Sequence, residues 1–229
     1  MGIEEKSGMF HDVIQFMEAV IFDMDGLMLD TERLTIPLWD EAGKKFGYRI
    51  TYDIVLRMVG ISSQRARAVL LEEFGENFPY EKIHDEFRLL CKREYEKGIP
   101  HKTGLGFLLY RLCAAKVPLG VATSTRRETA MEMLDKAGIL KHFAAITGGD
   151  EVENGKPAPD IFLLAAKKLG QPPCACIGFE DSPAGLQGLH AAGIRSVFIK
   201  DIIEPPPEIL ATVWRTYNDL SEATELFNL

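Results

Sequence analysis

The stretch AVIFDMDGLMLDTE, residues 19–32, constrains the fold of this chain more than any other segment. Its first four residues are all apolar, which is typical of a strand buried on both faces of a parallel sheet. Asp23 and Asp25 follow directly, and Gly26 permits a tight turn after them. Carboxylates at the end of such a strand lie where open parallel sheets bind ligands, although the same residues also suit a solvated turn.

The spacing of the two aspartates has a chemical consequence. Side chains at positions i and i+2 of an extended segment point the same way, so Asp23 and Asp25 are expected to lie close together. Two carboxylates held in this way repel each other unless a cation lies between them or one of them takes a proton. Either outcome favours a functional site.

Composition excludes several classes of protein. The chain has 229 residues, of which 46% are hydrophobic and 26% charged, as expected of a soluble globular protein. Its net charge of −8 argues against a nucleic-acid or anionic-membrane surface. No segment approaches the roughly 20 apolar residues needed to cross a bilayer. Residues 1–16 are too polar for a signal peptide, and we interpret them as a surface helix or a poorly ordered arm.

The cysteine pattern indicates a reducing compartment. The four cysteines are Cys91, Cys113, Cys174 and Cys176, and they include no C-x-x-C pair. We interpret all four as reduced core residues of a cytoplasmic protein. No long exposed apolar stripe is evident, so we expect a monomer or a weak dimer.

The hydrophobic pattern divides the chain into two predicted domains. In residues 34–99 apolar residues recur at helical spacing, as in Leu34, Leu38 and Ala42, and no strand is evident. Beyond His101 predicted strands alternate with predicted helices, which indicates βαβ units. The strands are predicted at 118–122, 143–147, 174–178 and 196–199, and the helices at 104–116, 127–137, 159–169 and 183–192. The tail after residue 207 is predicted to hold two short helices. We therefore predict an α/β fold with a Rossmann-like parallel sheet in residues 1–33 and 100–229, and a helical cap in residues 34–99.

Polar side chains follow several of the predicted strands. Thr123, Ser124 and Thr125 come after the strand 118–122, where a helix begins and could bind an anion. Lys156 lies in a loop that Pro157 and Pro159 stiffen. Taken singly, each of these features also suits an ordinary helix cap or a surface lysine.

Two more carboxylates, Glu180 and Asp181, come after the strand 174–178. Together with Asp23 and Asp25 they offer the hard oxygen ligands that Mg²⁺ prefers. A lysine, a hydroxyl group and backbone amides suit the oxygens of a phosphoryl group. The combined pattern favours a site for phosphoryl transfer.

Four motifs make the chain similar to the haloacid dehalogenase-like superfamily. They read DMDGLMLDTE (23–32), VATST (121–125), GKPAPDIF (155–162) and GFEDSPAG (178–185), in the order and spacing of that family. The residues of these motifs resemble those of the β-phosphoglucomutase-like phosphatases, which carry a helical cap and act on small phosphorylated metabolites such as sugar phosphates. The resemblance implies a cytoplasmic Mg²⁺-dependent phosphoric monoester hydrolase.

The resemblance also implies a role for each motif residue. Asp23 would attack phosphorus, and Asp25 would protonate the leaving oxygen and later take a proton from water. Mg²⁺ would be held by Asp23, the backbone carbonyl of Asp25 and Asp181, with Glu180 as a ligand or a supporting partner. The remaining predicted residues bind the transferred phosphoryl group or balance its charge: Thr123, Lys156, Gly26, Ser124 and Thr125.

The choice between phosphatase and mutase depends on the cap. The mutases that the chain resembles carry a histidine where Thr35 stands and a cap arginine where Ser63 stands. Both departures favour a phosphatase over a phosphosugar mutase. Two further candidates are a binding protein with a silent site and a phosphonate-cleaving enzyme that would use Lys44 or Lys45.

The cap is expected to choose the leaving group of the substrate. Gly60 marks a loop between cap helices, so the residues around it are candidates for substrate contact. These are Arg57, Ser62, Ser63, Gln64 and Arg65, with Arg65 favoured. The alternative is that these residues form an ordinary solvated helix face.

Overall fold

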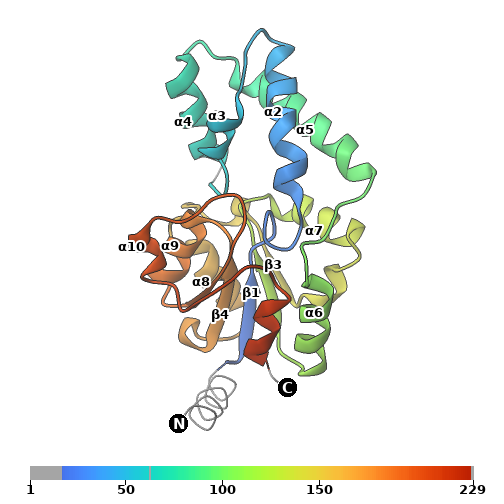
Figure 1. Ribbon diagram of the computed structural model, residues 1–229, viewed down its shortest axis with the longest axis vertical. Helices are drawn as coiled ribbons and strands as arrows, with labels where there is room; N and C mark the ends of the chain where they lie inside the picture. The colour runs from blue at the N-terminus through green and yellow to red at the C-terminus, as the bar shows by residue number, and fades with distance from the viewer. Residues whose placement is uncertain (1–16, 62, 228–229) are drawn as a thin grey trace.

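A parallel sheet forms the centre of the molecule. The computed structural model describes residues 17–61 and 63–227, and in these residues six strands pair in the order β3-β2-β1-β4-β5-β6. Every pair is parallel. The strands are β1 (Ala19–Phe22), β2 (Leu119–Ala122), β3 (Ala145–Thr147), β4 (Cys176–Glu180), β5 (Arg195–Ile199) and β6 (Arg215–Tyr217). The predicted α/β class is confirmed, and β1 lies between β2 and β4 near the middle of the sheet (Figure 1).

Helices cover both faces of this sheet because alternate residues of each strand point to opposite sides. Val20 and Phe22 pack with α6 (Leu105–Ala114), whereas Ala19 and Ile21 pack with α8 (Asp160–Lys168). All four residues of β1 are fully buried, as the unbroken apolar run predicts. The other two long helices of the core are α7 (Arg127–Lys136) and α9 (Pro183–Ala191).

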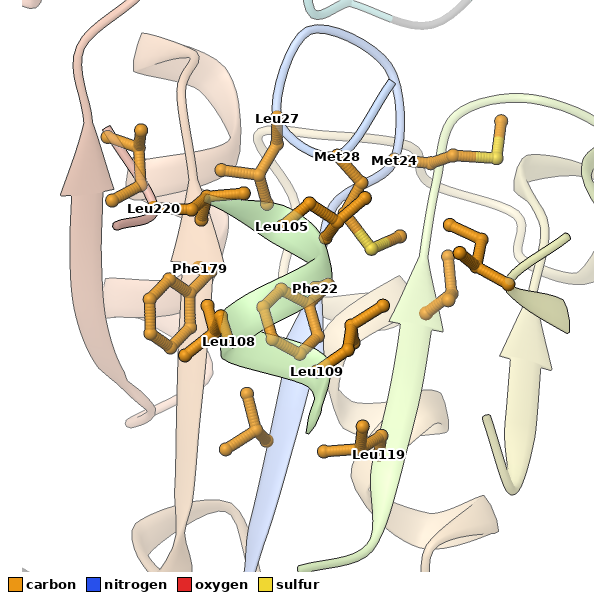
Figure 2. Close-up of a cluster of buried hydrophobic side chains, with 14 of the residues drawn as sticks. Phe22, Met24, Leu27, Met28, Leu105, Leu108, Leu109, Leu119, Phe179 and Leu220 are labelled. Atoms are coloured by element: carbon orange, nitrogen blue, oxygen red, sulfur yellow. The ribbon is translucent and has the colours of Figure 1, made fainter. Parts of the chain in front are cut away.

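The largest hydrophobic cluster of the core lies between α6 and the sheet. Figure 2 shows Leu105, Leu108 and Leu109 of α6 directed at Phe22 and Phe179 on the neighbouring strands β1 and β4. The two phenylalanine rings stack with their centroids 5.0 Å apart. Burial of each such side chain contributes about 1.5–3 kcal/mol, so this contact fixes the ends of β1 and β4 relative to each other.

Four helices inserted after β1 form a second unit. They are α2 (Thr31–Lys44), α3 (Tyr52–Leu56), α4 (Ser63–Phe74) and α5 (Tyr80–Glu96), and Figure 1 shows them together at one end of the sheet. They share a hydrophobic cluster of their own, in which the rings of Trp39 and Phe87 stack with centroids 4.0 Å apart. The described residues between Asp30 and Pro100 include no strand. This separate cluster supports the proposed division at residues 34–99, although α2 begins three residues earlier.

Some predicted element bounds differ from the structure. The strand predicted at 174–178 begins later and extends to Glu180, so this glutamate is the last residue of β4. The tail holds α10 (Pro207–Leu210), strand β6 and a 3-10 helix (Glu222–Phe227), whereas two helices were predicted. Strand β6 has the sequence RTY, which carries no apolar run, and it forms because its backbone pairs with the edge of β5.

The cysteine prediction is partly wrong. All four cysteines are free, and Cys91 and Cys176 are buried as predicted. Cys113 and Cys174 are exposed, because Cys113 lies on the solvent side of α6 and Cys174 lies in a turn before β4 begins. Among the described residues, none of the helices has the length and apolar character needed to cross a membrane. Residues 1–16, for which we predicted a surface helix or an arm, lie outside the described part of the chain.

Candidate active site

The carboxyl ends of β1, β2 and β4 bring the predicted polar residues together. Asp23 follows β1, and its N–H donates to the carbonyl of Phe179 on β4 at 3.0 Å. Thr123 follows β2, and its N–H donates to the carbonyl of Thr147 on β3 at 3.0 Å. The strand hydrogen bonding therefore continues one residue beyond β1 and β2, which fixes the backbone from which these two side chains project.

Lys156 forms the centre of a buried ion pair. Its side chain is 2% exposed and its ammonium group contacts Asp23 Oδ1 and, at 2.5 Å, Glu180 Oε1. Burial alone would lower the pKa of Lys156, but the charges of Asp23 and Glu180 raise it overall, so the ammonium form is retained. A buried lysine with two carboxylate partners is held in one position, unlike a lysine on the surface.

Glu180 acts as a bridge within this arrangement. Its Oε2 accepts hydrogen bonds from the N–H groups of Asp181 at 2.8 Å and Ser182 at 2.7 Å, while Oε1 binds Lys156. Both carboxylate oxygens are thus engaged by the protein. Of the two roles predicted for Glu180, these contacts support the role of a supporting partner over that of a direct metal ligand.

Asp25 lies in a different setting from Asp23. Its Oδ1 accepts a hydrogen bond from the Thr31 hydroxyl at 2.8 Å. Its Oδ2 accepts from the hydroxyls of Thr123 at 3.2 Å and Thr125 at 2.9 Å. Asp25 is half-buried and is held by neutral hydroxyl groups, whereas Asp23 is buried against an ammonium group. Carboxyl groups in contrasting environments of this kind suit separate chemical roles.

Two of the carboxyl groups around the end of β1 have too little positive charge nearby to stabilise their ionised forms. Burial raises the pKa of Asp23 above its usual range, even though the nearby Lys156 charge opposes this rise. Burial, followed by the charge of Glu180, raises the pKa of Asp181 well above its usual range. Asp181 Oδ1 is also buried without a hydrogen-bond partner among the residues that the structure describes. These groups would be stabilised by a cation.

The residues present fit a divalent cation with oxygen ligands. Asp23, Asp181 and the backbone carbonyl of Asp25 would hold it, as the resemblance implied. Gly26 adjoins this position in a left-handed conformation with φ of +82°, and a Cβ there would lie 2.4 Å from Asp181 Oδ2. The close approach of Asp181 to the chain at this turn therefore requires glycine.

Sequence reasoning missed two carboxylates of this region. One oxygen each from Glu32, Asp181 and Asp201 lies within 4.8 Å of the others. Glu32 belongs to the first motif, where the resemblance implied no role for it, and Asp201 follows β5 just as the other site residues follow their strands. The same rule of a polar residue after each strand, applied to β5, could have identified Asp201.

A cavity of about 830 Å³ lies between the sheet and the four inserted helices. Asp23, Asp25, Asp181 and the segment Thr123–Thr125 line its floor, and Thr35, Ser63, Arg88 and Lys92 line its upper wall. Lys156 and Glu180 lie behind this floor. The cavity gives a small molecule access to both aspartates.

Only some of the cap residues that were predicted to contact the substrate line this cavity. Ser63 lines it, whereas Gln64 and Arg65 are exposed and do not, and Ser62 lies outside the described residues. Arg57 pairs instead with Glu72 at 2.8 Å and Glu73 at 3.0 Å. The cationic groups that do reach the cavity from the cap are on α5, where no turn or motif in the sequence marks them.

The fold and this site define a class of proteins, the hydrolases of α/β fold with a carboxylate site at the sheet edge beneath a helical cap. Residues 20–199 match the family model of haloacid dehalogenase-like hydrolases, and the chain belongs to that family. A phosphorylated carbohydrates phosphatase of Thermotoga maritima is 33% identical over 187 residues, which are 80% of this chain and 84% of that protein. The prediction of a phosphoric monoester hydrolase of this family is confirmed.

Other relatives have mutase names. A beta-phosphoglucomutase of Bacillus subtilis is 31% identical over 188 residues, which are 79% of this chain and 82% of that protein. The crystal structure of a beta-phosphoglucomutase from Clostridium difficile matches with a TM-score of 0.79 at 25% identity, and the match covers 93% of this chain and 97% of that one. The fold is thus shared by relatives of both kinds.

Proposed function

We propose that the protein is a Mg²⁺-dependent phosphatase that hydrolyses a small phosphorylated metabolite, a sugar phosphate, through an aspartyl-phosphate on Asp23. The observation that carries this proposal is the pairing of Asp23 with a buried ammonium group, next to a second aspartate held by hydroxyl groups. A nucleophile and a general acid are thus held apart in different environments, and both line one cavity.

The proposed reaction has two steps. In the first, an oxygen of Asp23 forms a bond to phosphorus while the bond to the substrate oxygen breaks and Asp25 gives that oxygen a proton. In the second, Asp25 takes a proton from water, and the water oxygen displaces Asp23 from phosphorus and releases inorganic phosphate. Hydrogen bonds from three hydroxyl groups fix the Asp25 side chain at the cavity, where it would meet the leaving oxygen.

Other residues stabilise the transferred group. The N–H of Ser124 would bind a phosphoryl oxygen, as would the Thr123 hydroxyl once its proton turns from Asp25 to the phosphoryl group, with Thr125 and Gly26 beside them. Lys156 orients Asp23 and balances negative charge that develops as the phosphoryl group arrives. Mg²⁺, when bound, would neutralise charge on the phosphoryl oxygens and on the nucleophile.

The name of the Thermotoga maritima relative supports a phosphorylated carbohydrate as substrate. The cavity volume of about 830 Å³ falls within the range of roughly 300–1,000 Å³ that is usual for small-molecule sites. Arg88 and Lys92 place positive charge on its cap side, which suits a polar or anionic leaving group.

A phosphosugar mutase is the second candidate, supported by the Bacillus subtilis relative. Thr35 lines the cavity at the position of the histidine that the mutases carry, and a threonine hydroxyl is a poor base near neutral pH. This substitution favours hydrolysis. The phosphonate-cleaving alternative has no support, because Lys44 pairs with Asp40 at 2.7 Å, Lys45 pairs with Glu86 at 2.6 Å, and neither lines the cavity.

Location and assembly are part of this proposal. The four unpaired cysteines support a cytoplasmic protein, because disulfides are rare there. We retain the proposal of a monomer or weak dimer.

The first prediction concerns Asp23. Wild-type protein should release phosphate from p-nitrophenyl phosphate with Mg²⁺ and lose this activity with excess EDTA. Asp23→Asn should reduce kcat by a factor of about 10³ or more, because the nucleophile is removed. A panel of phosphorylated metabolites, assayed in the same way, would identify the substrate. Activity of Asp23→Asn close to that of wild type would overturn the proposed nucleophile.

A further inference from the structure

Three carboxylates from separate segments meet beside the candidate active site. Glu32 comes from the first turn of α2, Asp181 from the loop after β4, and Asp201 from the loop after β5. One oxygen of each lies within 4.8 Å of the others. We call these three residues the outer carboxylate cluster.

The positive charge near this cluster is unevenly distributed. Asp201 Oδ1 lies 2.7 Å from an Arg33 guanidinium nitrogen and 2.7 Å from Lys102 Nζ. Glu32 and Asp181 have no ion pair or side-chain hydrogen bond among the described residues. Asp201 therefore has positively charged partners among the described residues, whereas Glu32 and Asp181 have none.

The uncompensated oxygens are also buried. Glu32 is 9% exposed and Asp181 is 3% exposed. Within the described part of the chain, Glu32 Oε2, Asp181 Oδ1 and both carboxylate oxygens of Asp201 have no hydrogen-bond partner and negligible contact with solvent, but only Asp201 has ion-pair partners. Burying carboxylate oxygens without donors is costly, so the fold places Glu32 here at the expense of stability unless a cation is bound.

The turn at Gly26 brings Glu32 next to Asp181, one of the proposed metal ligands. A Cβ on Gly26 would lie 2.4 Å from Asp181 Oδ2 and 3.1 Å from Cδ of Glu32. Both carboxylates therefore rest against the same glycine, which directly follows Asp25. The backbone carbonyl proposed as a metal ligand belongs to that neighbouring residue.

We propose that Glu32 is a positioning residue for the divalent cation, which it binds as an anion, either directly or through a water molecule that the cation carries. This inference rests on the proposed magnesium site and adds to it a carboxylate from the cap. Asp201 pairs with Arg33 and Lys102, and these ion pairs keep both cations away from Glu32 and Asp181. Because Glu32 is in the first turn of α2, binding of the cation also fixes the start of the cap.

A rival role for Glu32 can be tested directly. If Glu32 were a neutral acid that donates a hydrogen bond to Asp181 or Asp201, then glutamine would replace it well, because glutamine has the same shape and can donate. If Glu32 acts as an anion, glutamine should fail and aspartate should recover part of the function.

The test is titration calorimetry of metal-free full-length protein with MgCl₂ and, separately, MnCl₂. Glu32→Gln should raise the Kd by about 10-fold or more, within the range for partners of metal ligands, and Glu32→Asp should lie between it and wild type. Glu41→Gln is the matched control, because Glu41 is an exposed glutamate of the same helix, and its Kd should stay within about twofold of wild type.

Two further measurements separate an effect of the substitution on folding from an effect on metal binding. In EDTA, Glu32→Gln should unfold at a temperature no lower than wild type, because it replaces a buried carboxyl group that lacks a hydrogen-bond partner with a neutral group of the same shape. A wild-type Kd for Glu32→Gln, or a clear loss of its thermal stability in EDTA, would overturn the role of Glu32. Absence of metal binding by wild-type protein would instead contradict the proposed Mg²⁺-dependent function itself.

Discussion

At the scale of single residues, Gly26 shows how closely the site is packed. Its φ of +82° is a conformation that residues with a Cβ adopt only at a cost of roughly 1–2 kcal/mol. It also stands where any Cβ would meet Asp181 Oδ2 at 2.4 Å. Gly47 offers a comparison, because its φ is +83° and nothing lies within 4 Å of its Cβ position.

Gly26→Ala and Gly47→Ala should therefore differ. Both should lose about 1–2 kcal/mol of unfolding free energy from the backbone conformation, and Gly26→Ala should lose more. Only Gly26→Ala should also lower the phosphatase kcat and weaken Mg²⁺ binding, because Asp181 must move. Urea unfolding, kinetics on p-nitrophenyl phosphate and calorimetry measure these effects. Equal activity in the two variants would contradict the close packing of Asp181 on this turn.

The sequence identified the residues that follow strands with recognisable patterns. Asp23, Thr123 and Asp181 each come after an apolar strand, so their convergence could be predicted from the topology of a parallel sheet. The partners of Asp25 could not, because they depend on which way three hydroxyl groups turn. Glu32 was missed because a glutamate in the first turn of a helix is ordinary, and only its burial reveals its role.

At the scale of elements, the start of α9 supports the ion pair of Lys156 with Asp23 and Glu180. Ser182 caps this helix by accepting the N–H of Gly185 at 3.1 Å, and Pro183 occupies the first turn. A Cβ on Gly185 would lie 1.8 Å from Glu180 Oε1. The helix can thus approach Glu180 only because this position is glycine.

Gly185→Ala should displace Glu180 and, through it, Lys156. We expect a stability loss of about 1–3 kcal/mol from overpacking and a fall in kcat. Gly106→Ala in the first turn of α6 is the control, because open space surrounds its Cβ position, and it should be neutral or stabilising by up to about 1 kcal/mol. Thermal unfolding and steady-state kinetics compare them. A Gly185→Ala enzyme with unchanged kcat would refute the link from α9 to Lys156.

Elements with strong local signals were predicted well. Gly138, Gly170 and Gly193 end helices in the left-handed conformation, as their positions in the sequence indicated. Strand β6 lacks such a signal, because its residues Arg215, Thr216 and Tyr217 do not alternate between apolar and polar side chains. Its structure depends on pairing with β5, which local sequence does not encode.

At the scale of the whole molecule, the cap rests directly on the core. A Cβ on Gly60, in the loop between α3 and α4, would lie 2.4 Å from the Cβ of Ser182. The two chain segments that join cap and core also pair, since the Asp30 N–H donates to the Pro100 carbonyl at 2.9 Å. This arrangement places the cap over the aspartates, with residues of α5 lining the cavity.

The substrate contacts of the cap should accordingly come from α5. Arg88→Ala should raise KM for a sugar phosphate substrate much more than KM for p-nitrophenyl phosphate, because Arg88 lines the cavity and Arg65 does not. Arg65→Ala provides the comparison, since the sequence alone favoured that residue. Steady-state kinetics of both variants on both substrates decide between them. A larger and substrate-selective effect of Arg65→Ala would show that the sequence-based prediction was right.

The central claim is that Asp23 receives the phosphoryl group at the carboxyl edge of the sheet. The most direct measurement is a rapid-quench experiment with Mg²⁺ and a substrate labelled with radioactive phosphorus. We predict that wild-type protein forms a transient, acid-stable phosphoprotein and that hydroxylamine releases the labelled phosphate from it. Asp23→Asn should form no such phosphoprotein. Phosphate release by wild-type protein without any labelled protein, or equal labelling of Asp23→Asn, would contradict the account.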